Sequence, residues 1–279
     1  MSAIIRRRKL SAGWYPETGE ATEEVLQDWC CRDFEKPRSR AVVVPHAGWT
    51  FSGRLAFDTL STLERSKTVV VVGGHLSSAS PLLVAPEDAY ETPLGIVETD
   101  LQLREYILQN FETAPDEDSE NSVEVVMPML KYLNPDARAV WLRVGPNSDL
   151  VQRLSQALAE VALHQDGSDI TVIGSTDLTH YGPAFGFTDH GLGEEAHAWV
   201  RESNDATMIE KLAHMDAQGI VECSIRDRSA CSAGAAAVAV GYARAVGCDD
   251  AELIGYHTSY DCRAADSFVG YAGITYRRR

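Results

Sequence analysis

Two kinds of hydrophobic pattern alternate along the chain. Short continuous apolar runs, rich in Val and Ile, predict strands at Ala41–Val44, Val69–Val72, Ala139–Val144, Ile170–Gly174 and Phe268–Tyr276. Longer windows with helical spacing separate them, at Glu23–Cys31, Arg54–Leu63, Leu101–Phe111, Ser122–Leu133, Asp149–Leu163, Glu194–Glu202 and Ala233–Val246. Continuous apolar runs are typical of strands covered on both faces. The alternation predicts an α/β fold in three layers, with a mainly parallel central sheet between helices.

Local signals refine this prediction at a few points. Asn147 and Ser148 are suitable caps for the helix that follows them, and Gly247 is a suitable stop for the last helix. The Pro-rich segment 81–95 predicts a short strand or hairpin, and the acidic stretch 115–120 predicts a loop. We find no internal repeat and no composition shift, so residues 1–279 are interpreted as a single domain.

Composition and charge exclude several classes of protein. The 279 residues include 44% hydrophobic and 24% charged residues, which is an ordinary globular composition. The net charge of −16 repels polyanions, so a nucleic-acid partner is not expected. The basic clusters Arg6–Lys9 and Arg277–Arg279 are interpreted as solvated tails. The longest apolar stretch, Ala233–Val240, is too short to span a membrane, and no secretion signal is visible. We therefore expect a cytoplasmic protein with reduced cysteines.

Polar side chains follow three of the predicted strands directly. His46 comes after the run that ends at Val44, His75 follows Gly73 and Gly74, and Asp177 and His180 follow the run that ends at Gly174. The carboxyl ends of parallel strands form the ligand crevice of an open α/β sheet. We therefore expect these four side chains to meet in one site.

Cys231 is the cysteine best placed to join that site. It lies at the start of a helical window of small residues, where the helix dipole favours the thiolate and the small side chains permit close approach to the sheet. Two imidazoles and a thiolate would leave coordination positions open, as catalytic metal sites do. Such a donor set suits Fe(II), Cu or Zn and disfavours Mg or Ca.

Two carboxylates are further candidates. Asp177 lies three residues before His180 and is suited to orient that ring for proton transfer. The alternative is that Asp177 caps the turn after its strand. Glu124 lies at the start of a helical window and is interpreted either as a capping residue or as a supporting group of the site and its substrate pocket.

Several segments of the chain resemble the MEMO family, whose bacterial and archaeal members are called AmmeMemoRadiSam system protein B. The resemblance follows the chain order from near its start to near its end. The segments that carry it are Ser11–Pro16, Pro45–Gly53, Asn121–Glu124, Ser175–Gly182, Ala230–Gly234 and Ser267–Ile274. The segment P-H-A-G-W-T-F-S-G at Pro45–Gly53 is the most specific of them. Asn121 departs from the family, in which many members carry His at this position.

The resemblance implies a fold similar to the class III extradiol dioxygenases, which are non-haem iron enzymes. It also implies a metal held by His46, His75 and Cys231, with Asp177 and His180 in the same pocket. The dioxygenases use a carboxylate where this chain has Cys231, so ring cleavage itself is not implied. The family name further implies a functional link to radical SAM and AMMECR1-like proteins.

Three functions follow as hypotheses. The first is a metal-dependent oxidoreductase acting on a small molecule, with Fe(II) as the first choice of metal and Cu as the alternative, and with His180 as acid and base. The second is a non-enzymatic module that binds phosphotyrosine-type peptides in the same pocket, with Trp14 and Phe51 as walls. The third is a zinc hydrolase that uses metal-activated water.

Overall fold

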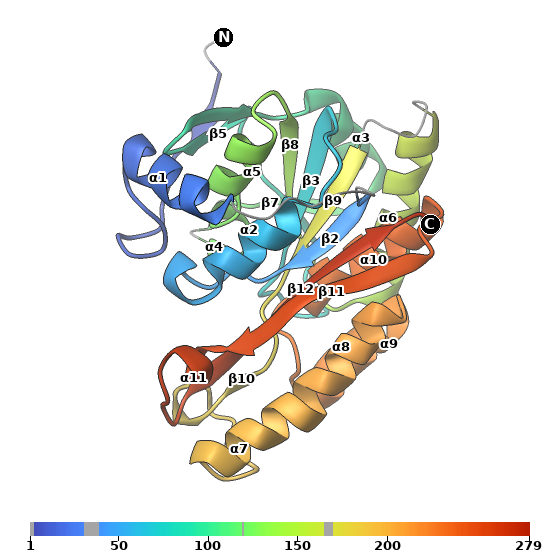
Figure 1. The fold of residues 1–279 in the computed structure, drawn as a ribbon. Helices are drawn as coiled ribbons and strands as arrows, with labels where there is room; N and C mark the ends of the chain where they lie inside the picture. Colours follow the sequence, from blue (N-terminus) through green and yellow to red (C-terminus); the bar gives the residue numbers. More distant parts are fainter. Residues whose placement is uncertain (1–2, 31–38, 119, 165–169) are drawn as a thin grey trace.

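A large mixed sheet forms the centre of the molecule (Figure 1). The computed structural model describes residues 3–30, 39–118, 120–164 and 170–279, and within them the sheet has nine strands in the order β10-β12-β2-β9-β3-β8-β4-β7, with β11 paired to β12. Its four central strands are parallel, and they are β2 (Ala41–Val44), β9 (Ile170–Ser175), β3 (Thr68–Gly73) and β8 (Arg138–Arg143). All four lie at positions that the sequence predicted.

Antiparallel strands flank the four central strands on both sides, which corrects the expectation of a mainly parallel sheet. At one edge β12 (Phe268–Arg277) pairs antiparallel with β2, β11 (Asp250–Thr258) and β10 (His180–Tyr181). At the other edge β4 (Leu82–Val84) runs antiparallel to β8 and parallel to β7 (Thr113–Pro115). Strand β11 was missed because it is a half-exposed edge strand without a continuous apolar run.

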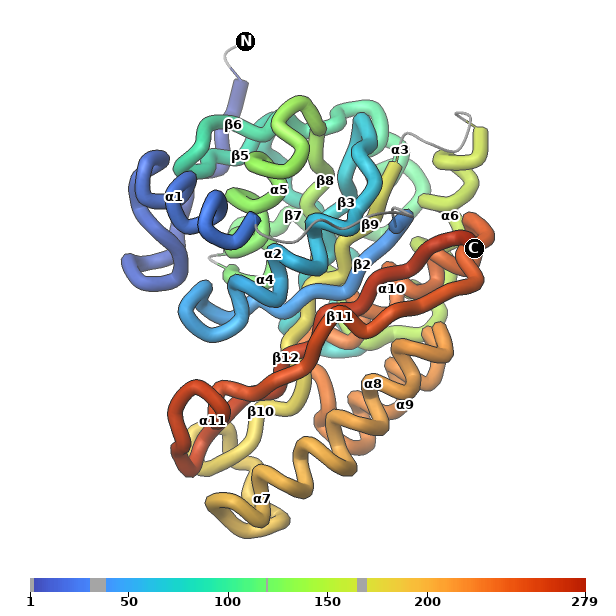
Figure 2. The backbone as a smooth tube through the Cα atoms, in the orientation of Figure 1, coloured from blue at the N-terminus to red at the C-terminus, as the bar shows by residue number. Residues whose placement is uncertain are grey.

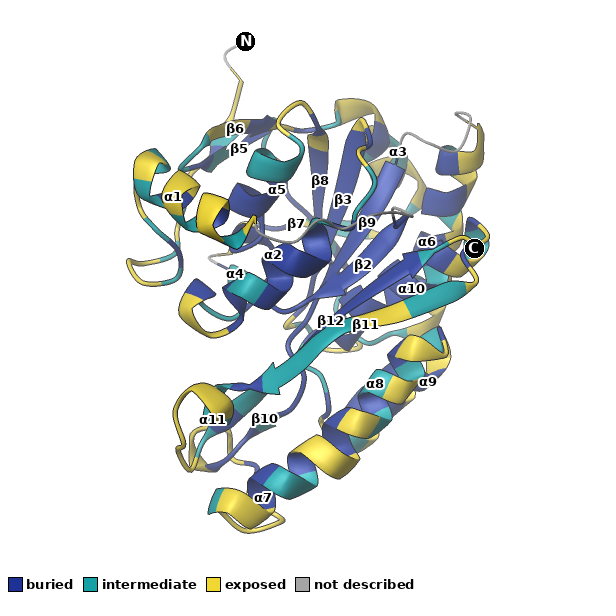
Figure 3. Ribbon diagram, in the orientation of Figure 1, coloured by how far each residue is buried: buried dark blue, intermediate teal, exposed yellow. Residues whose placement is uncertain are grey.

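Helices cover both faces of the central strands, as expected. Val42 and Val44 pack into one hydrophobic layer, while the alternate residues Ala41 and Val43 pack into the other. The first layer includes α1 (Gly19–Trp29), α2 (Arg54–Leu60), α4 (Asn121–Glu124) and α5 (Met127–Leu133). The second includes α3 (Leu101–Asn110), α6 (Ser148–His164), α9 (Ala217–Asp227) and α10 (Ala233–Ala245). Strands β2, β3 and β9 are accordingly buried along their whole length (Figure 3), and β8 is buried after its first residue.

Helix boundaries agree with the predicted windows except at a few points. The window Ser122–Leu133 is divided into α4 and α5, with Pro128 in the first turn of α5, where its missing N–H costs nothing. Asn147 caps α6 by accepting from the backbone N–H of Leu150, as predicted. Gly247 follows α10 with a φ of +85°, as expected of a stop. The first predicted window ends at Cys31, which lies outside the described residues.

The segment between β10 and α10 holds helices that the sequence pattern did not predict. Only α7 (Gly193–Trp199) was expected, and a π-helical turn, Val200–Asn204, joins it to α8 (Asp205–Ala213). Helices α8 and α9 follow, and they lie below the sheet in Figure 1. Among the helices that the structure describes, none is both long enough and apolar enough to cross a membrane.

The basic N-terminal segment is not a solvated tail. Its strand β1 (Ile5–Arg6) joins β5 (Ala89–Thr92) and β6 (Gly95–Glu98) in a separate three-stranded sheet (Figure 2). The β5–β6 hairpin confirms the strand or hairpin expected near residues 81–95. Arg6 is only 4% exposed and donates to the backbone oxygens of Asp116 and Asp118. The acidic stretch expected to be a simple loop therefore supplies buried partners to this arginine.

Candidate metal centre

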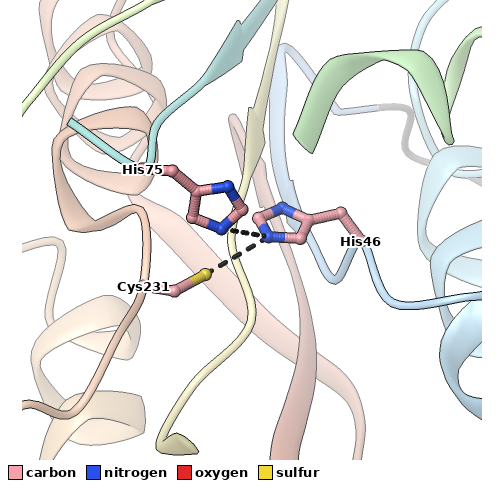
Figure 4. A group of neighbouring side chains, drawn as sticks. All are labelled: His46, His75 and Cys231. Carbon is pink, nitrogen blue, oxygen red and sulfur yellow. Dashed lines mark hydrogen bonds between the residues drawn. The ribbon is translucent and has the colours of Figure 1, made fainter. Parts of the chain in front are cut away.

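Three side chains from distant parts of the chain meet at the carboxyl ends of the central strands (Figure 4). His46 follows β2, His75 follows β3, and Cys231 precedes α10. The Nε2 atom of His46 lies 3.2 Å from Nε2 of His75 and 3.2 Å from Sγ of Cys231. One ligand atom from each residue lies within 4.8 Å of the other two, which is close enough for a shared ion.

His46 is fixed on both its backbone and its ring. Its backbone N–H donates to Oδ1 of Asp177 at 2.7 Å, and its Nδ1 lies 3.0 Å from Oγ of Ser175. The side chain is 1% exposed. With Nδ1 bonded to the hydroxyl, Nε2 is the nitrogen that faces His75 and Cys231.

His75 has an unusual backbone conformation. Its φ of +59° lies in the left-handed region, which costs a residue with a Cβ about 1 kcal/mol. The backbone oxygen of the preceding Gly74 accepts from Nε of Arg143 at 2.9 Å. The ring bonds through Nδ1 to Oε1 of Glu120 at 2.6 Å, and the side chain is 32% exposed.

Cys231 lies just before the first turn of α10. Its backbone N–H donates to the oxygen of Asp177, and its Sγ lies 3.8 Å from Oγ1 of Thr176. Helix α10 approaches the sheet closely, as its small residues predicted. A Cβ on Gly174 in β9 would lie 2.6 Å from the backbone oxygen of Ala235.

The three candidate ligands shift one another's protonation. Burial alone would raise the pKa of the Cys231 thiol, but the neighbouring rings of His46 and His75 hold that pKa well below its usual range. Burial alone would lower the pKa of His75, but its bonds to Cys231 and Glu120 raise that pKa to about 10. The pKa of His46 is raised against burial by Cys231 and Asp177. The imidazoles therefore favour the thiolate form of Cys231, and the thiolate in turn favours a proton on the imidazoles.

A pocket opens beside these ligands. Two of its walls are aromatic, since Trp14 and the 45% exposed Phe51 both line it. The backbone oxygen of Phe51 contacts Nε2 of His257 in β11 at 2.8 Å. The residues that line the pocket are Ala12, Gly13, Trp14, His46, Ala47, Gly48, Phe51, His75, Asn121, Asp177, His180 and Val269. His180 therefore shares a pocket with His46 and His75, as the strand ends predicted.

Two carboxylates have different contacts from those the sequence suggested. Asp177 bonds to the backbone of His46, whereas Nδ1 of His180 contacts the backbone oxygen of Leu178 at 3.2 Å. Glu124 is not one of the described residues that line the pocket. It accepts from the backbone N–H groups of Lys9 and Leu10 and from the hydroxyl of Tyr15, so it anchors the segment that carries Trp14.

Sequence reasoning missed Glu120, Ser175 and Arg143. Glu120 was part of an acidic stretch interpreted as a loop, yet it is 7% exposed and caps α4. Its position directly before Asn121 and Ser122 was the available signal, because a carboxylate there can cap a helix. Arg143 lies within the predicted strand Ala139–Val144, and nothing local shows that its partners lie in two other loops.

Comparison with known proteins identifies relatives over the whole chain. A family model described as Memo-like protein matches residues 6–275. A MEMO1 family protein of Thermococcus onnurineus is 32% identical to this chain, and one of Pyrococcus abyssi is 33% identical. Each alignment has 295 positions and covers 99% of this chain and 100% of the relative. The crystal structure of an uncharacterized protein from Escherichia coli K12 has a similar fold, with a TM-score of 0.54, 15% identity, and coverage of 85% of this chain and 99% of the other.

Proposed function

The chain belongs to the Memo-like family, and from its preassembled group of two histidines and a cysteine we propose that it is a metal-dependent oxidoreductase that acts on a small molecule. The observation that carries the proposal is the convergence of three ligand atoms within 4.8 Å of one another. The similarity to class III extradiol dioxygenases, and Fe(II) as the resident ion, are parts of this proposal. Cu and Zn are the alternatives.

The donor set fits a transition metal. Nδ1 of His46 is bonded to Ser175 and Nδ1 of His75 to Glu120, so both Nε2 atoms are available to a common ion. Cys231 supplies a soft thiolate, which together with imidazole favours Fe, Cu or Zn over Mg or Ca. An Fe or Cu ion held by these three residues would supply the one-electron chemistry that the side chains lack.

The remaining pocket residues bind substrate and move protons. Trp14 and Phe51 offer apolar faces for a small molecule, and Nδ2 of Asn121 already donates to the backbone oxygen of His46. His180 contacts the oxygen of Leu178 through Nδ1, so Nδ1 carries a proton and Nε2 is the atom that can accept or return one. The ring of Phe185 packs edge-on against the ring of His180, with 4.9 Å between the ring centroids, and restrains it.

The test is metal analysis of protein purified without oxygen. We expect close to one Fe or Cu per chain in the natural protein and a large loss in Cys231→Ala. The exposed thiol of Cys262 provides the matched control, because Cys262→Ala leaves the three ligands intact. Stoichiometric absence of every transition metal, together with a melting temperature that metal addition does not change, would contradict the proposal.

A second candidate function is capture of a phosphotyrosine-type peptide, and the aromatic residues Trp14 and Phe51 favour it. Two observations weigh against it. The residues described as lining the pocket include neither Arg nor Lys, and the net charge of −16 repels a phosphate. Titration of a phosphotyrosine peptide into the natural protein and His180→Ala tests this function, and equal affinities would remove the pocket from it.

A further inference from the structure

The carboxylate of Glu120 bonds directly to a candidate metal ligand. Its Oε1 lies 2.6 Å from Nδ1 of His75, and Glu120 is only 7% exposed. A carboxylate oxygen can only accept, so Nδ1 of His75 carries the proton of this bond. In the neutral ring, which is the form that binds a metal, Nε2 then has the lone pair, and this is the atom that lies 3.2 Å from Nε2 of His46.

Glu120 is itself held from its other oxygen. Oε2 accepts from the backbone N–H of Ser122 at 2.9 Å and from the hydroxyl of Ser122, and Nε of Arg143 lies 3.6 Å away. The side chain of Arg143 is 4% exposed and is paired with Asp116 at 3.0 Å. The carboxylate therefore has little freedom to leave His75.

Arg143 also holds the backbone next to His75. Its Nε donates to the oxygen of Gly74, the residue before the left-handed His75. One buried guanidinium thus contacts both the backbone that sets the direction of the His75 side chain and the carboxylate that sets the rotation of its ring.

His46 differs in this respect. Its Nδ1 faces the hydroxyl of Ser175, which can donate or accept and so does not select one tautomer. Within the described part of the site, only His75 has a carboxylate on its outer nitrogen. Such a carboxylate fixes ring orientation and makes the ligand nitrogen more basic.

We propose that Glu120, held by Arg143, is a positioning residue that presets Nε2 of His75 for the metal. The inference rests on the proposed metal site and adds a residue to it. A change at Glu120 should weaken metal binding through His75 alone, and leave the contributions of His46 and Cys231 in place.

The experiment compares Glu120→Gln with the natural protein in titrations with Zn²⁺ and Co²⁺. Gln has the same shape, but both oxygens of Glu120 accept from donors, so its amide group must face either His75 or Ser122 with a donor of its own. We expect the dissociation constant for Zn²⁺ to rise about 10- to 100-fold. The thiolate-to-cobalt absorption of Cys231 should remain while the ligand-field bands change.

Two controls separate positioning from a general loss of structure. Glu117 lies exposed three residues earlier in the same stretch, and Glu117→Gln should bind Zn²⁺ like the natural protein. Glu120→Gln added to His75→Ala should produce no further loss, since the effect acts through the ring that is gone. Thermal unfolding without metal checks that each variant is folded.

The outcomes are distinct. If the natural protein binds neither Zn²⁺ nor Co²⁺, the proposed function fails and this inference fails with it. If the natural protein binds and Glu120→Gln binds equally well, only the inference is overturned. An equal fold loss on the His75→Ala background would also overturn it, because Glu120 would then not act through His75.

Discussion

At the scale of single residues, the candidate metal site depends on a close approach between two loops. Gly74 precedes His75, and Ser232 follows Cys231. A Cβ on Gly74 would lie 2.5 Å from the Cβ of Ser232, and both groups are buried. Gly74 therefore permits the close approach that brings the candidate ligands His75 and Cys231 together.

We expect Gly74→Ala to weaken metal binding and to lower the free energy of unfolding by about 1–3 kcal/mol, because the added methyl group forces the two loops apart. Zn²⁺ titration and chemical denaturation measure the two effects. Gly186→Ala is the control, because its φ of +58° imposes backbone strain while no atom lies within 4 Å of the added Cβ. Equal Zn²⁺ affinity in Gly74→Ala and the natural protein would contradict the prediction.

Metal affinity should depend on pH. The pKa of His75 is raised to about 10, so below that pH an incoming ion must displace a proton from this ring. The affinity for Zn²⁺ should therefore rise about tenfold for each pH unit and each displaced proton between pH 6 and pH 8. Calorimetric titration in two buffers of different ionisation enthalpy counts the protons. Binding without proton release would show that the rings are neutral before the metal arrives.

The convergence of the three candidate ligands could be predicted from the sequence better than the residues that support them. His46, His75 and Cys231 lie next to strand or helix ends, and that local signal can be seen without a structure. Glu120 could not be assigned in this way, because its role comes from a ring 45 residues away. The same is true of Asp116, whose partners Arg6 and Arg143 lie far before it and far after it in the sequence.

At the scale of elements, Asp205 connects α8 to the segment that carries His180. Its Oδ1 accepts from the backbone N–H and the hydroxyl of Thr179, and its Oδ2 accepts from the hydroxyl of Tyr256 in β11. Asp205 is fully buried, and burial raises its pKa to about 6. The first turn of α8 is therefore attached to the residue directly before His180.

Asp205 should make stability fall as pH rises from 4 to 6. Across this window the folded protein keeps the proton of Asp205 while the unfolded chain, with an ordinary pKa near 3.8, has lost it. Relative to Asp205→Asn, the natural protein should lose up to about 3 kcal/mol across the window. Urea denaturation at several pH values measures this difference. The exposed Glu210 on the same helix is the control, and Glu210→Gln should keep the slope of the natural protein.

Strand β1 depends on the buried charge of Arg6. We expect Arg6→Ala to lower the free energy of unfolding by about 3–5 kcal/mol. The change leaves the buried carboxylate of Asp116 with one partner fewer and removes two hydrogen bonds to backbone oxygens. Arg7→Ala should cost at most about 1 kcal/mol, since that side chain is 70% exposed. Thermal and urea unfolding compare the two. Equal costs would mean that β1 contributes little to the fold.

Elements with a strong local pattern could be predicted, and those defined by their neighbours could not. Strands β2, β3, β8 and β9 are continuous apolar runs because both of their faces are covered. Strand β11 has half-exposed residues over most of its length, and its identity as a strand comes from pairing with β12. Helix α9 has too few apolar residues at helical spacing to be distinguished from a loop by its sequence, although three of these residues are buried in the core.

At the scale of the whole molecule, burial is concentrated in the central strands. Every residue of β3 and β9 is buried, whereas three of the four residues of β6 are exposed. Opening of the central strands requires unfolding of the layers on both faces, so their amides should exchange hydrogen most slowly. Hydrogen exchange followed by mass spectrometry should show β6 exchanging at least about tenfold faster than β3. Uniform rates would indicate that the two sheets open as one unit.

The order of strands in the central sheet has a consequence for biosynthesis. Strand β9 lies between β2 and β3, and Cys231 is contributed from a still later part of the chain. During synthesis, His46 and His75 are therefore made well before strand β9, which completes the sheet between β2 and β3. Domains tend to fold as units during synthesis. The nascent chain cannot form the three-residue group in its mature geometry, so an ion held by all three side chains would bind only after nearly the whole protein has been synthesised.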